Sequence, residues 1–102
     1  MKLTIDTTAE FDKWLMSVKD LEGRGAIVAR LHRAEDGNFG DCKPVGEGMS
    51  EMRVFHGPGY RIYFVRSGQT SFLMLYGSDK TDQKRCIKRA KEILDALRGA
   101  KK

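Results

Sequence analysis

Apolar and polar positions alternate at the start of the chain and then change to a spacing of three and four residues. The segment KLTID at 2–6 alternates and predicts a short strand. Thr7 followed three residues later by Glu10 predicts a capping box, in which each side chain satisfies a free backbone N–H at a helix start. One apolar helix stripe is then predicted, made of Phe11, Trp14, Leu15, Val18 and Leu21.

Two glycines interrupt this stripe. Gly23 and Gly25 predict a break or tight turn, because glycine is unfavourable inside a helix. A second helix is predicted from about residue 26 to residue 34, with apolar positions at Ile27, Val28 and Leu31.

The second half of the chain reads mainly as strands. Residues 36–48 are rich in glycine and predict a loop, with a short edge strand around Cys42 to Val45. Alternating runs at 50–56 and 60–66 flank GPG at 57–59, a strong turn signal. SGQT at 67–70 is a second turn, and the run SFLMLYG at 71–77 is apolar on both faces, which is typical of a central strand.

The last predicted element is a helix from about Thr81 to Arg98. Its predicted buried stripe consists of Ile87, Ala90, Ile93, Leu94 and Leu97. Its solvated side is basic and consists of Lys84, Arg85, Lys88, Arg89 and Lys91.

The order of elements predicts an α+β fold in a single domain, residues 1–102. Strands joined by tight turns must be antiparallel, so the sheet is expected to be small and antiparallel. We expect the two N-terminal helices and the C-terminal helix to pack on one face of this sheet. The other face would then be free.

The hairpin at 51–64 has two faces of different character. If GPG is the turn, His56 pairs with Tyr60 and alternation assigns one apolar face, made of Met52, Val54, Tyr60, Ile62 and Phe64. The opposite face then carries Glu51, Arg53, Phe55, Arg61 and Tyr63. A two-residue PG turn would instead flip one strand relative to the other.

The second face places Arg53 near Arg61, and like charges that are close destabilise a sheet unless something offsets them. One interpretation is that Glu51 pairs with one arginine and the rest is solvated. The other is a polyanion site, in which guanidinium groups hold phosphate while Phe55 and Tyr63 stack on bases. Lys43 and Lys80 would reach the edges of the same surface.

Composition narrows the class of protein without choosing a function. The formal net charge of +5 makes a polyanion or an acidic protein partner plausible. No apolar run approaches the roughly 20 residues of a membrane span, and the start lacks a signal-peptide pattern, so we expect a cytoplasmic protein without a membrane partner. The two cysteines and two histidines lack ligand spacing, so we expect neither a metal nor another cofactor.

Residues 37–64, GNFGDCKPVGEGMSEMRVFHGPGYRIYF, resemble the signature of the RelE/ParE superfamily of bacterial toxins. The similar pieces are GDCKPVGEG at 40–48, SEMRV at 50–54, GPGYRIYF at 57–64 and GSDK at 77–80. The resemblance extends to FDKWLMSVKD at 11–20 and RLHRAEDGN at 30–38, and the branch is that of addiction-module killer proteins, the HigB-type or phage Gp49-like toxins.

The resemblance implies a toxin of a type II toxin–antitoxin system, neutralised by a small DNA-binding antitoxin through which operator DNA is reached. Most RelE-like members cleave mRNA on the ribosome without a metal and so stop translation, whereas ParE-like members poison DNA gyrase. A third alternative is a catalytically decayed module that keeps only antitoxin binding.

The resemblance also implies site residues. Arg61 occupies the position of the phosphate-binding arginine, Lys43 lies in the loop of the catalytic lysines, and Lys80 follows the last strand, where another basic residue is common. Arg53 of the E-x-R motif would point to the same face. Independently of the resemblance, the basic side of the last helix, with Arg85, would either contact RNA or be no more than a soluble helix face.

Proton transfer is where the chain departs from its relatives. They use a late tyrosine or histidine, but no tyrosine follows Tyr76 and no histidine follows His56. The role would then fall to Glu51, Asp79, Tyr63 or a lysine, and the sequence does not choose among them.

Overall fold

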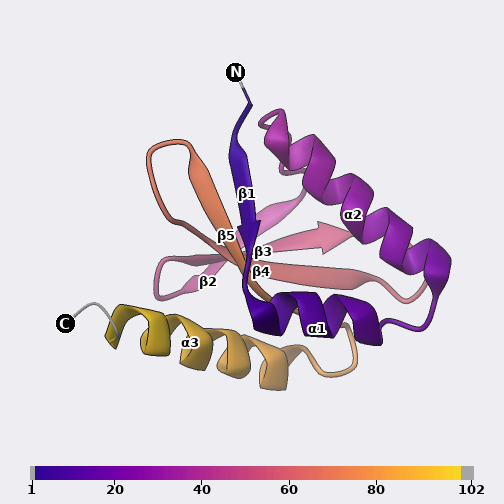
Figure 1. Cartoon of the computed structure of the whole chain (residues 1–102). Helices are drawn as coiled ribbons and strands as arrows, with labels where there is room; N and C mark the ends of the chain where they lie inside the picture. The colour runs from indigo at the N-terminus through magenta and orange to yellow at the C-terminus, as the bar shows by residue number, and fades with distance from the viewer. Residues whose placement is uncertain (1, 100–102) are drawn as a thin grey trace.

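A five-stranded mixed sheet with three helices forms the protein, as seen in a computed structural model that describes residues 2–99 (Figure 1). The α+β class is therefore confirmed. Along the chain the elements are β1 (Thr4–Thr7), α1 (Ala9–Ser17), α2 (Leu21–Glu35), β2 (Cys42–Gly46), β3 (Met49–Val54), β4 (Tyr60–Arg66), β5 (Ser71–Asp79) and α3 (Gln83–Gly99).

The strand order in the sheet is β1-β5-β4-β3-β2. The pairs β2–β3, β3–β4 and β4–β5 are antiparallel, as the tight turns predict, whereas β1 lies parallel to β5. The apolar run at 71–77 does lie inside the sheet, and the short strand after the glycine-rich loop does form an edge. No helix within residues 2–99 is long and apolar enough to cross a membrane.

The helices cover both faces of the sheet, so the expectation that all three share one face is wrong. On one face, Phe11 of α1 and Ile27 of α2 join Met52 and Ile62 in one apolar cluster. On the other face, α3 buries Cys86, Ala90, Ile93 and Leu94 in a second cluster with Tyr63, Val65 and Leu75. The second face is therefore largely covered, but near the N-terminal end of α3 the side chain of Arg53 stays 35% exposed.

The helix boundaries differ from the predicted ones in two places. Thr8, rather than Thr7, caps α1, and its hydroxyl accepts a hydrogen bond from the Phe11 N–H at 2.9 Å. The break between the helices falls at residues 18–20, and both glycines lie inside α2, which begins at Leu21. Gly23 is required there because a Cβ at this position would lie 2.8 Å from the Tyr60 hydroxyl.

The hairpin between β3 and β4 keeps the predicted faces but has a longer turn. Val54 pairs with Tyr60, so residues 55–59 form the connection and the expected pairing of His56 with Tyr60 is wrong. Both pairings link even-numbered residues, which is why the assignment of side chains to faces is confirmed.

Candidate nucleic-acid interface

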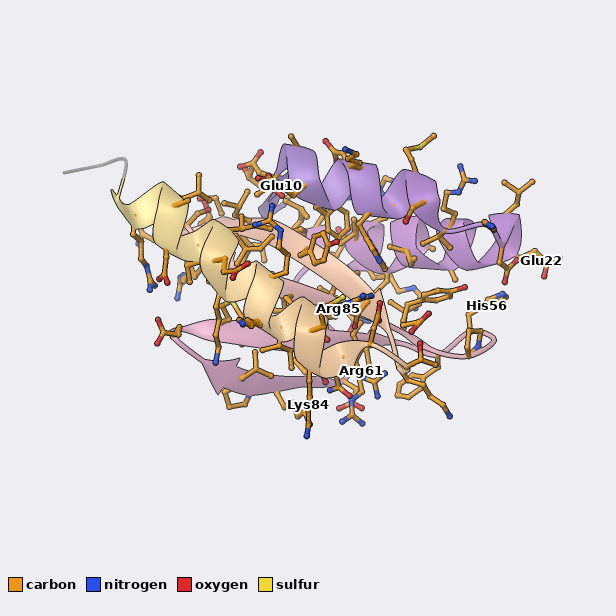
Figure 2. The ribbon with its side chains drawn as sticks, turned by 90° about the horizontal axis from the view of Figure 1, so that it is seen from below. Glu10, Glu22, His56, Arg61, Lys84 and Arg85 are labelled. Carbon is orange, nitrogen blue, oxygen red and sulfur yellow. The ribbon has the colours of Figure 1, made fainter. Side chains whose placement is uncertain are left out.

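Two arginines stand side by side on adjacent strands, at the end of the sheet face that α3 leaves open. Arg53 of β3 and Arg61 of β4 are directly opposed in the antiparallel register, so their side chains leave the same face. Their side chains are 35% and 17% exposed, respectively. Figure 2 shows Arg61 beside the start of α3, close to Lys84 in that view.

Glu51 lies between these arginines and is fully buried. One of its oxygens, Oε1, is 3.5 Å from Nε of Arg53 and 3.6 Å from Nε of Arg61. The other oxygen, Oε2, accepts a hydrogen bond of 2.7 Å from Nε2 of Gln83 in the first turn of α3. Glu51 therefore contacts both arginines rather than one, and its lack of exposure keeps it from contacting a substrate.

A pocket of about 420 Å³ adjoins the arginine pair. Its wall is the 55–59 turn, and Arg53, Arg61 and Lys80 contribute its cations. Phe55 stands at its rim with 79% of its surface exposed. Cations and an exposed aromatic ring therefore occur together here, the combination found in sites for single-stranded nucleic acid.

Lys43 and Lys80 approach this surface from its two sides. Lys43 of β2 is paired with Glu51 in the register, so its side chain leaves the same sheet face one strand further out. Lys80 follows β5, lines the arginine pocket and is exposed. Both lysines are accessible to a ligand on the open end of the face.

Tyr63 is on the predicted face but unavailable to bases, so its assignment as a stacking residue is wrong. It is fully buried under α3, and its hydroxyl lies 2.8 Å from the Ser78 hydroxyl. Burial raises the pKa of Tyr63 to about 12. A phenol that is buried and already hydrogen-bonded is a poor proton donor to RNA.

Asp79 is also poorly suited to proton transfer. Its carboxylate accepts hydrogen bonds from the Thr81 hydroxyl at 2.6 Å and from the Thr81 N–H at 2.8 Å. These hydrogen bonds, the side-chain one foremost, lower the pKa of Asp79. Of the groups that the sequence left open for proton transfer, the lysines therefore keep the best access.

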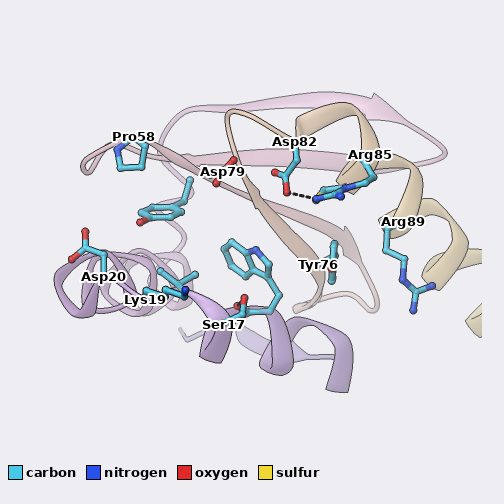
Figure 3. Close-up of a pocket in the computed structure, with 13 residues that line it drawn as sticks. Ser17, Lys19, Asp20, Pro58, Tyr76, Asp79, Asp82, Arg85 and Arg89 are labelled. Atoms are coloured by element: carbon cyan, nitrogen blue, oxygen red, sulfur yellow. Dashed lines mark hydrogen bonds and ion pairs between the residues drawn. The ribbon is translucent and has the colours of Figure 1, made fainter.

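Arg85 does not line the arginine pocket, although it lines a neighbouring pocket together with Lys80. It donates a 2.8 Å hydrogen bond to Asp82 and lines a larger pocket of about 690 Å³ between α1 and α3 (Figure 3). The carboxylates of that pocket already have partners, since Asp20 caps α2 and Asp79 bonds to Thr81. We therefore place the candidate site in the smaller pocket, although the larger one offers more space.

Two residues of the site could not be found from sequence spacing. Gln83 reaches Glu51 across 32 positions of the chain, and a polar residue in a helix's first turn gives no signal of such a contact. His56 lines the arginine pocket and lies 3.4 Å from Asp20 at the start of α2. Its place directly beside the GPG turn was its only signal. Within residues 2–99, no cluster of three or more potential metal ligands occurs.

The sequence is 40% identical over 97 residues to an uncharacterized protein of Haemophilus influenzae, covering 95% of this chain and 98% of that one. The chain belongs to the same family as that protein. No family model matches the sequence. This family relationship extends over nearly the whole chain, so it includes the arginine hairpin and α3.

The structure is similar to a chain in the toxin–antitoxin complex RelBE2 from Mycobacterium tuberculosis. The TM-score is 0.64, and the match covers 78% of this chain and 100% of that chain at 16% sequence identity. At this low sequence identity, the similarity shows a shared fold and nothing further. This chain therefore has a RelE-like fold, as the resemblance in the sequence implied.

Proposed function

We propose that this protein is the toxin of a type II toxin–antitoxin system, of the HigB-type branch, and that it cleaves mRNA on the ribosome without a metal. The observation that carries the proposal is the pair of opposed arginines at the pocket beside Lys80 and Phe55. The RelE-like fold and the toxin motifs at 40–64 support the same class.

The proposed reaction is an attack of the ribose 2′-oxygen on the adjacent phosphorus. The bond from phosphorus to the 5′-oxygen breaks, and a 2′,3′-cyclic phosphate remains. Arg53, Arg61 and Lys80 would hold the negative charge that builds up on the phosphorane. A base must take the 2′ proton and an acid must protonate the leaving 5′-oxygen.

The accessible titratable groups for these proton transfers are Lys43, Lys80 and His56. Glu51, Tyr63 and Asp79 are less suitable because they are buried or hydrogen-bonded. Orientation of the message by the ribosome would lower what the protein itself must supply, since correct positioning removes much of a reaction's entropic cost.

The partner that we propose is a DNA-binding antitoxin with an acidic contact segment. It would cover the arginine pocket or compete for it, because a surface that holds phosphates attracts negative charge. The exposed basic side of α3, including Lys84, Arg85 and Lys88, extends this positive field. Reversing these three charges should slow antitoxin association at low salt and have less effect at high salt, since exposed charges are screened.

The deciding experiment is to induce the chain alone and together with the neighbouring reading frame, and then to map mRNA ends. The proposal predicts growth arrest with new mRNA ends, relieved by the neighbouring protein. Arrest of DNA replication with intact mRNA would instead indicate a gyrase poison. Expression without growth arrest would indicate a catalytically decayed module that only binds the antitoxin. The absence of a late tyrosine or histidine supports this alternative.

A further inference from the structure

Two cations directly opposed on neighbouring strands repel each other, yet the structure holds them at fixed positions. The group that lies between Arg53 and Arg61 is the carboxylate of Glu51. It is fully buried, so its charge is compensated by these arginines and by Gln83 rather than by water. The arginines therefore owe their arrangement to a residue that no substrate reaches.

The manner of contact leaves the arginines free to bind. Glu51 approaches both guanidinium groups at Nε, the nitrogen nearest the main chain. Arg61 has no ion-pair partner other than Glu51 among residues 2–99, and Arg53 uses one terminal nitrogen for a 3.7 Å contact with Asp41. Terminal nitrogens are the ones that reach outward to a phosphate.

We propose that Glu51 is a positioning residue, which holds Arg53 and Arg61 by their inner nitrogens so that their outer nitrogens face one phosphate group. Gln83 fixes the carboxylate in turn, through its 2.7 Å hydrogen bond from the first turn of α3. The contacts from Oε1 exceed hydrogen-bond length, and both Oε1 and Nε of Arg61 lack a hydrogen-bond partner among residues 2–99. Glu51 therefore holds the arginines by charge rather than by hydrogen bonds.

This inference rests on the proposed RNA substrate. Glu51→Gln tests it because a site that needs only positive charge and a site that needs Glu51 for positioning predict opposite changes in RNA affinity. The substitution keeps the side chain's size and an oxygen for Gln83 but raises the net charge by one. If the site senses only positive charge, RNA binding should tighten. If Glu51 positions the arginines, binding should weaken by about tenfold, the loss expected for one charge-assisted contact.

The probe is a fluorescein-labelled five-nucleotide 2′-O-methyl RNA, which cannot be cleaved, measured by anisotropy at several salt concentrations. Glu92→Gln is the matched control, because it removes one exposed carboxylate of α3 that pairs with Arg89 at 3.8 Å. We expect Glu92→Gln to bind as the unmodified protein does. Glu51→Gln should also show a smaller salt slope, since fewer cations would reach phosphates.

A second measurement separates this proposal from the proposed function. Without RNA, nitrogen NMR should show restricted motion of the Nε–H groups of Arg53 and Arg61 in the unmodified protein and freer motion in Glu51→Gln. If the unmodified protein fails to bind the RNA, the proposed function is wrong. The NMR measurement needs no RNA, so it still tests whether Glu51 positions the two arginines. Unchanged motion, or equal or tighter RNA binding by Glu51→Gln, would overturn the proposal.

A third variant covers the case in which Glu51→Gln does not fold. Gln83→Leu removes only the hydrogen bond to Oε2 and keeps every charge of the cluster. It should weaken RNA binding by a few fold and increase the motion of the same two Nε–H groups. Wild-type binding and unchanged motion in a folded Gln83→Leu protein would then count against the proposal.

Discussion

Gly77 of β5 lies directly beneath the ring of Trp14, so replacing this glycine tests how tightly α1 packs on the sheet. A Cβ at position 77 would overlap three ring atoms of Trp14. Trp14 is itself packed against Phe11, with ring centroids 5.6 Å apart, so the indole cannot retreat without disturbing the core. Gly77→Ala is therefore expected to destabilise the fold.

The magnitude follows from two opposing terms. Overpacking a core by one carbon costs about 1–3 kcal/mol. Removing a glycine from a strand returns about 0.5–1 kcal/mol of backbone entropy. Because the overlap involves three ring atoms, the cost lies in the upper part of the first range, about 2–3 kcal/mol. The net loss is then about 1–2.5 kcal/mol, which for a domain near 100 residues lowers Tm by roughly 5–20 °C. Thermal unfolding followed by circular dichroism measures it.

Gly25 of α2 provides the matched control. Nothing lies within 4 Å of a Cβ built at Gly25, and this residue is exposed within a helix. Gly25→Ala should therefore stabilise the protein by about 0.5–1 kcal/mol, which is the opposite sign. Because Trp14 is the chain's single tryptophan, its emission should change in Gly77→Ala and not in Gly25→Ala. A Tm of Gly77→Ala equal to or above that of the unmodified protein would refute the reasoning.

Arg61→Ala should abolish growth arrest and also cost about 1–3 kcal/mol of stability, since Glu51 loses one of its partners; arrest at the unmodified level would contradict the proposed site. Ile62→Asp should prevent cooperative melting, because Ile62 is fully buried and the carboxylate of the introduced aspartate would be unpaired. Unfolded tyrosine has a pKa of about 10, whereas that of Tyr63 is raised to about 12. The neutral phenol's stabilisation should therefore be complete below pH 10 and lost as pH rises toward 12, and Tyr63→Phe should flatten that part of the stability curve. At pH 8 a thiol reagent should modify the exposed Cys42 and spare Cys86, which is buried with a pKa raised to about 11, until denaturant is added; rapid reaction of both thiols in the native protein would show that α3 is loosely packed.

Local geometry explains what the sequence determined by itself. The faces of the hairpin follow from the two-residue period of a strand, so Met52 and Ile62 were assigned to one side and Arg53 and Arg61 to the other without any tertiary information. The run at 71–77 indicated a central strand because it is apolar on both faces, and β5 does lie inside the sheet. The toxin motifs predicted the RelE-like fold.

Long-range packing decided the rest. Whether α3 lies on the same face as α1 and α2 depends on the direction in which the chain turns after the end of β5, and no period within α3 encodes that. A signal was present in the apolar residues Val65 and Leu75 on the second face, which need a cover.

The side on which α3 packs determines the site. It buries Tyr63, which alternation alone presented as exposed, and it brings Gln83 to Glu51. The sequence thus determined which side chains share a face. The tertiary structure decided which of them water and a ligand can reach, because accessibility depends on contacts between segments far apart in the chain.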